Sequence, residues 1–247
     1  MQRYFVSEEY IDISKKVVTI EGNDFHHIKN VMRMKINDEV FVCNNLGDSF
    51  LCKIILFTNN NVILSICNKL EEKTEIPAII TIAQGLIKRE KTEEVIQKIT
   101  ELGASYYLPV LMERSIVRIK ENISNKVIRY NTISKEASEQ CHRTKMLEVL
   151  NPIDLNELLK ISKNYDLCIY AYEESGRNKN QRLKQLLKEN INKNILVLVG
   201  PEGGISLKEV ELLNKSGFEA VGLGPRILRT ETAPIYIMSA ISYEFEL

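Results

Sequence analysis

The stretch Ile195–Glu211, ILVLVGPEGGISLKEVE, decides the fold of the C-terminal part of the chain. Its first five residues, Ile195–Val199, are all apolar and predict a buried strand. They run directly into the turn Gly200–Gly204, which contains three glycines and one acid. Ser206 and Glu209 then form the S-x-x-E pattern of a capping box, so a helix should begin beside them. Strand, glycine turn and helix in this order are typical of an α/β domain.

The glycine turn does not match the phosphate-binding turns that it superficially resembles. A P-loop requires a lysine after its last glycine, and a dinucleotide fingerprint requires G-x-G-x-x-G; GPEGG fits neither. Glu202 inside the turn would also repel a phosphate. The pattern therefore indicates a neutral or cationic ligand approached closely by the backbone. A tight structural turn that binds nothing explains the same glycines.

On both sides of the strand, turn and helix of Ile195–Glu211, predicted strands and helices alternate, which favours a largely parallel sheet. In the predicted helix Lys91–Leu102 the apolar residues form one stripe, and Gly103 stands where a C-terminal cap belongs. The other strands expected in this part of the chain are Ala78–Ala83, Tyr106–Val110, Asp166–Tyr172 and Phe218–Leu223.

A second turn lies in Leu223–Pro234, LGPRILRTETAP. Arg226 and Arg229 flank the apolar pair Ile227-Leu228, and a final helix should begin near Thr232 or Ala233. We expect the two turns to follow neighbouring strands. The carboxyl ends of such strands form the crevice in which open α/β sheets bind their ligands.

Residues 1–70 show a different pattern, of short strands separated by turns, which predicts a small, mostly β barrel. One helix should interrupt it, near Asp24 to Met34, with Asp24 as N-cap. Residues 71–77 are polar, end in proline and are expected to form a linker to the domain 78–247. The strands expected before the linker are Arg3–Val6, Val17–Ile20, Glu39–Cys43, Phe50–Phe57 and Val62–Cys67.

The predicted helix has two stripes at the same helical spacing. Phe25, Ile28 and Met32 form the apolar stripe and should pack inward. The polar stripe consists of His26, Lys29 and Arg33. It is either a solvated face or a surface that contacts phosphates, and the spacing alone does not decide between these.

Composition describes an ordinary globular protein without a bulk charge. Lys+Arg and Asp+Glu both number 33, so any nucleic-acid surface must be a local patch. The five cysteines form no C-x-x-C pair, which favours free thiols in a reducing cytosol and no metal site. No apolar run approaches the roughly 20 residues of a membrane span, and the N-terminus lacks a signal-peptide core. A cytoplasmic protein without a membrane partner is expected.

The two glycine turns carry a family resemblance. LVGPEGGIS followed by LGPRILRTETA resembles the cofactor-binding loops of SPOUT methyltransferases, and more narrowly the family of ribosomal RNA small subunit methyltransferase E. RYFV, HHIKNVMRMKINDEV, QKITELGASYYLPVLMERS and EASEQCHR stand in that family's order and spacing, so the resemblance covers essentially the whole chain. His142 departs from it, because many members have glycine before this arginine.

The resemblance implies a fold and an activity. Residues 78–247 should form a SPOUT α/β domain with a deep trefoil knot, and residues 1–70 a PUA-like RNA-binding barrel. The implied reaction is methylation of N3 of a uridine in 16S ribosomal RNA, with S-adenosylmethionine as cofactor. The implied assembly is a homodimer, acting on free RNA or on the assembled small subunit.

Two rival functions stay open. One is a SPOUT enzyme with another target, either transfer RNA or 23S ribosomal RNA. The other is a non-catalytic RNA-binding assembly factor, against which the intact LGPRILRTETA argues. A nucleotide-dependent enzyme is disfavoured because the glycine turn has no lysine.

The resemblance also implies the site residues. Arg229 is the first choice for stabilising the uridine anion and Arg226 the second, because a guanidinium favours negative charge on a base. No residue stands out as a general base; His142 is the one candidate, at a position where the family has another residue. Glu139 and Gln140 should orient arginines. The implied cofactor-binding residues are Val199, Gly200, Glu202, Gly203, Leu223, Gly224, Ile227, Leu228, Thr230 and Ala233, and the implied RNA-binding residues are Arg3, His26, Lys29, Arg33, Arg114 and Arg143.

Overall fold

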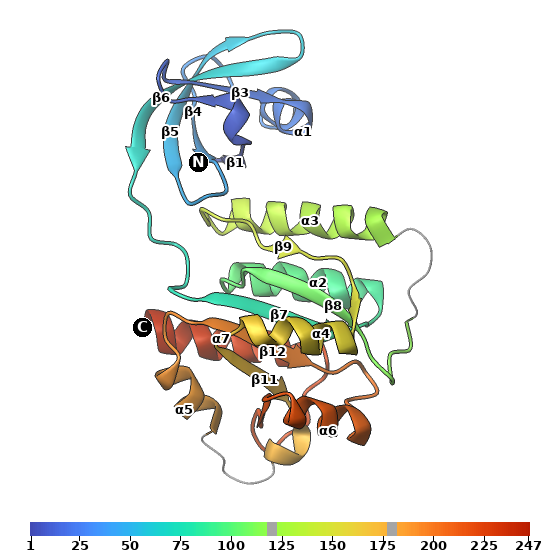
Figure 1. The fold of residues 1–247 in the computed structure, drawn as a ribbon. Coiled ribbons are helices and arrows are strands. Elements are labelled where there is room, and N and C mark those ends of the chain that lie inside the picture. The colour runs from blue at the N-terminus through green and yellow to red at the C-terminus, as the bar shows by residue number, and fades with distance from the viewer. Residues whose placement is uncertain (118–122, 177–181) are drawn as a thin grey trace. The chain divides into compact units, whose positions relative to one another are not determined.

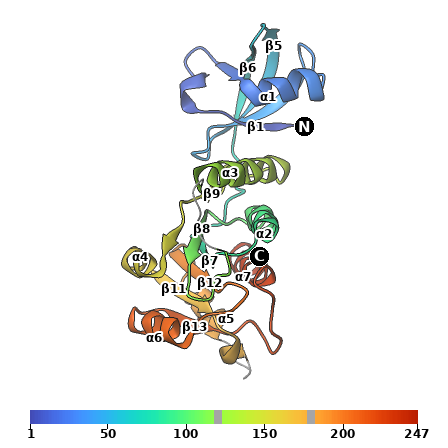
Figure 2. The same cartoon turned by 90° about the vertical axis from the view of Figure 1, so that its right-hand side faces the viewer.

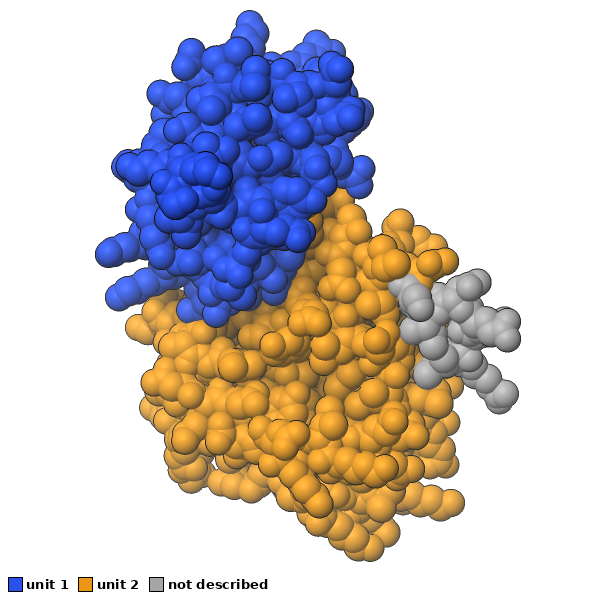
Figure 3. Space-filling view, turned by 45° about the horizontal axis from the view of Figure 1, so that its top comes forward, with its two compact units in different colours: residues 1–75, 138–146 blue, residues 76–137, 147–247 orange. Residues whose placement is uncertain are grey.

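The computed structural model describes residues 1–117, 123–176 and 182–247 (Figure 1). It divides into two compact units, residues 1–75 with 138–146 and residues 76–137 with 147–247 (Figure 3). Residues 138–146, expected in the second domain, therefore belong to the first compact unit.

The first unit is built on a curled six-stranded sheet in the order β1-β4-β5-β6-β3-β2. The β1–β4 pair is parallel and the other neighbours are antiparallel. Alternate residues point into its core, such as Val40 and Val42 of β4 and Cys52 and Ile54 of β5, all fully buried. The elements are β1 Arg3–Phe5, η1 Glu8–Tyr10, β2 Ile11–Asp12, β3 Val17–Glu21, β4 Glu39–Cys43, β5 Ser49–Phe57 and β6 Asn61–Leu70. All five predicted strands are present, and β2 is additional.

The helix of this unit differs from its prediction in two ways. It consists of α1 Gly22–His26 followed by the π-helical segment η2 His27–Val31. Asp24 lies inside α1 and is not its N-cap, because the helix begins two residues earlier. Met32, expected to pack inward, is 40% exposed. A π-turn bonds i to i+5, so residues seven apart no longer share a face, and Met34 packs against the core instead.

The second unit contains a parallel sheet in the order β10-β8-β7-β12-β11-β13, with β9 also paired to β8. The prediction that the two glycine turns follow neighbouring strands is wrong, because β11 lies between β12 and β13. The strands are β7 Ile79–Gly85, β8 Tyr106–Leu111, β9 Glu148–Val149, β10 Ile153–Asp154, β11 Leu167–Ala171, β12 Asn194–Val199 and β13 Glu219–Val221. The trefoil knot stays a prediction.

Helices cover both faces of this sheet (Figure 2). Apolar side chains of α2, α3, α5 and α7 pack on one face, and those of α4 and α6 on the other. The helices are α2 Arg89–Glu101, α3 Ile123–Gln140, α4 Leu155–Ile161, α5 Arg182–Glu189, α6 Leu207–Lys215 and α7 Thr232–Glu246, with short 3-10 turns η3 Ser162–Asn164 and η4 Glu173–Gly176. No helix in the described ranges is long and apolar enough to cross a membrane.

Local signals explain where the helices next to the site begin and end. The capping box is confirmed: the Ser206 side chain accepts from the Glu209 backbone, the Glu209 side chain accepts from the Ser206 backbone, and α6 begins at Leu207. Gly103 has a φ of 88° just after α2, a left-handed conformation that glycine adopts without a steric penalty. A Cβ at this position would also lie 2.6 Å from Ile76 Cδ1, so a larger residue would require the buried Ile76 side chain to shift.

Candidate active site

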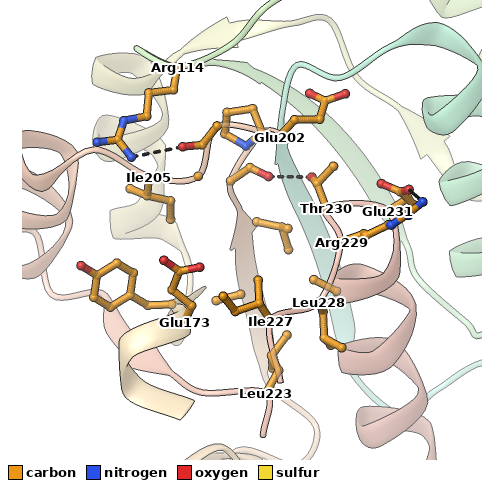
Figure 4. Close-up of a pocket in the computed structure, with 18 of the residues that line it drawn as sticks. Arg114, Glu173, Glu202, Ile205, Leu223, Ile227, Leu228, Arg229, Thr230 and Glu231 are labelled. Carbon is orange, nitrogen blue, oxygen red and sulfur yellow. Dashed lines mark hydrogen bonds and ion pairs between the residues drawn. The ribbon is translucent and has the colours of Figure 1, made fainter. Parts of the chain in front are cut away.

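A pocket of about 500 Å³ opens at the carboxyl ends of β11, β12 and β13 (Figure 4). Its walls come from the turn after β12, the loop between β13 and α7, and residues Ala171–Glu173 after β11. This volume is typical of a small-molecule site. Every residue that the resemblance implies for cofactor binding lines it, namely Val199, Gly200, Glu202, Gly203, Leu223, Gly224, Ile227, Leu228, Thr230 and Ala233.

The two glycine-containing loops are held together by a short chain of hydrogen bonds. The Thr230 hydroxyl donates to the Gly200 carbonyl at 2.7 Å (Figure 4). The Gln84 amide nitrogen donates to the Thr230 carbonyl at 2.8 Å, and the Tyr107 hydroxyl donates to the Gln84 amide oxygen at 3.0 Å. Gln84 is fully buried in β7, so the strand interior fixes the position of the second loop. Nothing in the local sequence pattern had singled out Gln84.

Gly203 of the turn and Gly85 of β7 each pack closely against neighbouring residues of the protein. A Cβ at Gly203 would lie 2.9 Å from Arg114 Cβ and 3.1 Å from the Arg114 carbonyl oxygen. A Cβ at Gly85, the last residue of β7, would lie 2.4 Å from Pro201 Cδ in the middle of the turn. The sequence indicated close approach of a ligand as the reason for the glycines of the turn, which stays a prediction; the structure adds the close approach of Arg114 and Pro201 as a further reason. Gly85 was missed, although a glycine ending a strand signals such a contact.

The pocket contains a cation that the sequence of the turn does not reveal. Lys91 reaches it from α2, and its Nζ lies 3.0 Å from Glu231 Oε2 and 3.9 Å from Glu202 Oε1. Neither carboxylate oxygen of Glu202 has a hydrogen-bond partner, although both are buried. The glycine turn itself therefore contains no lysine, but the pocket does contain one, Lys91. Its ammonium group lies between two acids.

The charge on Glu231 is set by two opposing effects. Burial, the largest single effect, opposes ionisation of this carboxyl group, but the hydrogen bond from Lys91, a backbone hydrogen bond and the charges of Lys91 and Arg229 together outweigh it, so the pKa of Glu231 lies below its usual value. Glu231 is therefore an anion at neutral pH, and it directly follows the loop that carries Arg226 and Arg229.

Three arginines border the pocket, and they differ in how their side chains are held by other residues. The Arg229 side chain is 84% exposed, and its nearest acid, Glu231, is 4.0 Å away. Arg226 is also exposed. Arg114, expected to contact RNA, donates from Nη1 to the Gly203 carbonyl at 3.1 Å and so braces the glycine turn (Figure 4). Arg226 and Arg229 are therefore both accessible at the edge of the pocket, whereas Arg114 is held by the glycine turn.

The three residues predicted to form the polar stripe of the first unit lie on the surface, although the π-helical segment His27–Val31 changes their helical spacing. His26, Lys29 and Arg33 are all exposed, and Lys29 lies over the Phe25 ring at 5.0 Å. Arg33 has a φ of 52°, a left-handed conformation that ends the helical segment. The three side chains are therefore accessible from solvent.

Two arginines expected at an RNA surface are instead buried structural residues. The Arg3 side chain is 0% exposed and binds Glu72 through both carboxylate oxygens, at 2.7 and 2.9 Å. Arg143 is 4% exposed and binds Glu75 at 2.6 Å. These pairs hold linker residues within the first unit, so the structure contradicts an RNA-contacting role for Arg3 and Arg143. Sequence spacing did not indicate that the linker supplies their partners.

The backbone conformation at His142 explains why many family members have glycine at this position. Its φ is 61°, in the left-handed region that glycine favours. The ring packs edge-on against Phe41, with centroids 6.2 Å apart. The described residues that line the pocket in the second unit include no histidine, and a general base stays unassigned. Across the part of the chain that the structure describes, no group of three or more His, Cys, Asp or Glu side chains forms a metal site.

Comparison with protein families relates both units to known domains. A family model described as an RNA methyltransferase domain matches residues 74–242, and one described as an RNA methyltransferase PUA domain matches residues 20–67. The chain is 38% identical, over 251 residues, to the ribosomal RNA small subunit methyltransferase E of Bacillus subtilis, with 100% of this chain and 98% of that protein covered.

Solved structures show the same similarity. A ribosomal RNA small subunit methyltransferase E from Neisseria gonorrhoeae, bound to S-adenosyl methionine, is 27% identical with a TM-score of 0.84, and 98% of this chain and 97% of that chain are covered. A putative methyltransferase from Legionella pneumophila, in complex with the same cofactor, is 28% identical with a TM-score of 0.85 over the same shares of the two chains.

Proposed function

Since the chain belongs to the ribosomal RNA small subunit methyltransferase E family of RNA methyltransferases, we propose that it methylates N3 of a uridine in 16S ribosomal RNA with S-adenosylmethionine. The resemblance read from the two glycine turns is thereby confirmed. The observation that carries the proposal is the pocket at the ends of β11, β12 and β13, because both turns contribute to it.

The pocket lining suits this cofactor. When bound, S-adenosylmethionine supplies an electrophilic methyl group on a positively charged sulfur. Leu223, Ile227 and Leu228 offer an apolar wall to an adenine ring. The buried carboxylate oxygens of Glu202 accept no hydrogen bond, and a carboxylate in the lining suits a cationic ligand better than a phosphate.

The residues of the chain then act mainly by position and charge. In the reaction a bond forms between N3 and the methyl carbon, the bond from that carbon to sulfur breaks, and the N3 proton passes to solvent. Arg229 stabilises the negative charge that develops on the uracil carbonyl oxygens as the proton leaves. The two loops hold the reacting groups in line, which lowers the entropic part of the barrier.

The decisive experiment compares RNA substrates. The protein is incubated with methyl-labelled S-adenosylmethionine and separately with 16S RNA, 23S RNA, transfer RNA and assembled small subunits, and the modified base is mapped by mass spectrometry. Label on N3 of a 16S uridine supports the proposal, and comparison with assembled subunits identifies the natural substrate. Label only in 23S or transfer RNA contradicts the target. Cofactor binding without label in any RNA contradicts the activity. A ribosomal RNA substrate also implies a cytoplasmic enzyme.

We propose that the first unit anchors RNA through the exposed polar stripe. Replacing Lys29 and Arg33 together by glutamine removes two cations, so RNA binding should weaken and the salt dependence of log K should become shallower by about 1.4 to 1.8. Binding isotherms across a salt series measure both quantities, and cofactor affinity should not change.

The matched control for this experiment replaces Lys53 and Lys69 by glutamine. These lysines carry the same charge in the same unit, but they are paired with Glu39 at 3.8 Å and Asp48 at 2.5 Å. Their removal should leave the salt slope nearly unchanged. Equal slopes for the wild type and the Lys29/Arg33 variant would show that the stripe is merely solvated.

We also propose a homodimer formed through the second unit. Support comes from family membership and from large side chains exposed on α7, Tyr236 at 47% and Tyr243 at 68%. Light scattering at a concentration where the enzyme is active should give about twice the chain mass of 28.4 kDa. A mass near that of one chain would rule out the arrangement.

A further inference from the structure

Lys91 lies outside both glycine loops but faces an acid from each of them. It belongs to α2, and its Nζ lies 3.0 Å from Glu231 Oε2 and 3.9 Å from Glu202 Oε1. All three residues line the pocket. With Arg229 they form a cluster of two cations and two anions whose charges cancel, at the pocket edge where Arg229 and Glu231 lie side by side (Figure 4).

Within this cluster two cations compete for one carboxylate. Lys91 binds Oε2 of Glu231 at hydrogen-bond distance, whereas Arg229 Nη1 lies 4.0 Å from Oε1. An arginine beside a carboxylate that has no other cationic partner ordinarily forms a bidentate pair with it at about 2.8 Å. The Glu231 side chain is only 14% exposed, so water satisfies little of its charge and a protein cation must do so. The long distance between Arg229 and Glu231 is therefore consistent with the hydrogen bond that Lys91 already donates to Glu231.

We propose that Lys91 is a positioning residue: by holding the Glu231 carboxylate, it prevents Glu231 from capturing Arg229 and leaves that guanidinium free for the uracil. The inference rests on the proposed function and on the role of Arg229 in it. Lys91 touches neither reacting group and acts through Glu231. Without Lys91, the partly buried Glu231 pairs with Arg229, and the side chain that is now 84% exposed is withdrawn from the substrate.

A purely structural role for Lys91 makes different predictions. If Lys91 only ties α2 to the loops, then removing either partner of the Lys91–Glu231 pair should loosen the pocket to a similar extent, and removing both should restore nothing. If Lys91 protects Arg229, loss of Lys91 is harmful only while Glu231 is charged. The double variant therefore distinguishes the two roles.

The test measures single-turnover methylation at saturating RNA and cofactor for Lys91→Gln, Glu231→Gln and the double variant. Lys91→Gln should be slower than the wild type by about tenfold, and the double variant should be faster than Lys91→Gln by about threefold or more. Glu231 precedes α7 but its side chain makes no capping hydrogen bond, so Glu231→Gln does not disturb the helix start. Lys98→Gln is the control: it also lies on α2 and pairs with Glu101 at 3.0 Å, and it should have no effect.

A crystal structure of Lys91→Gln provides a readout that does not depend on activity. The guanidinium of Arg229 should be bidentate on Glu231 in it. A guanidinium that stays apart from Glu231, a double variant as slow as Lys91→Gln, or a Lys91→Gln rate equal to the wild type would each overturn the inference. A wild-type protein that methylates none of the RNAs would instead overturn the proposed function.

Discussion

Replacing Arg229 by alanine should slow single-turnover methylation by about a hundredfold or more, with little change in the affinity for RNA or cofactor. The guanidinium is charged at any working pH and presents a planar fork that can reach a carbonyl oxygen of the base. Its side chain is 84% exposed, and the nearest acid is 4.0 Å away, so alanine removes little packing. The variant should therefore lose stabilisation of the transition state, while its free energy of unfolding stays close to that of the wild type.

Two further variants separate charge from geometry. Arg229→Lys keeps the charge but loses the fork, so it should retain part of the activity. Arg226→Ala is the matched comparison, because Arg226 is exposed on the same loop and lines the same pocket. A near-normal single-turnover rate in Arg229→Ala would exclude this residue from the mechanism and favour Arg226. A lower melting temperature with poorer cofactor binding would indicate a structural role for Arg229.

Replacing Gly203 by valine should weaken S-adenosylmethionine binding by about a hundredfold, as measured by calorimetry. The added Cβ would lie 3.1 Å from the Arg114 carbonyl oxygen, a backbone atom that cannot move cheaply. The turn must shift, which breaks the 3.1 Å hydrogen bond from Arg114 to the Gly203 carbonyl and displaces Glu202. Displacements of about 1 Å in a positioned site are sufficient for losses of this size.

Gly217→Ala is the control for a general loss of stability. Gly217 has a φ of 83° at the end of α6, and a Cβ there would meet no atom within 4 Å. Alanine should cost about 1–2 kcal/mol of conformational strain and lower the melting temperature while cofactor affinity is kept. Equal cofactor affinity in a folded Gly203→Val protein would refute the assignment of the first loop.

The sequence alone determined the features that depend on residues close together in the chain. The capping box at Ser206, the left-handed glycine after α2 and the apolar run of β12 are each decided within a few positions, and all were predicted correctly. The family could be recognised from the sequence because each of its two loops is one continuous segment. The residues of both loops line one pocket. Periodicity failed only where the local geometry changed, at the π-turn that rotates Met32 outward.

Only the tertiary structure decided which charges are buried and which are free. Arg3 and Lys91 are ordinary basic residues in the sequence, yet Arg3 is paired with an acid 69 positions away and Lys91 with Glu231, 140 positions away. The same holds for the sheet order, which inserts β11 between β12 and β13 and adds a third wall to the pocket. The free energy of a charge depends on its desolvation and on its partners, and both are set by long-range packing that no short window of sequence contains.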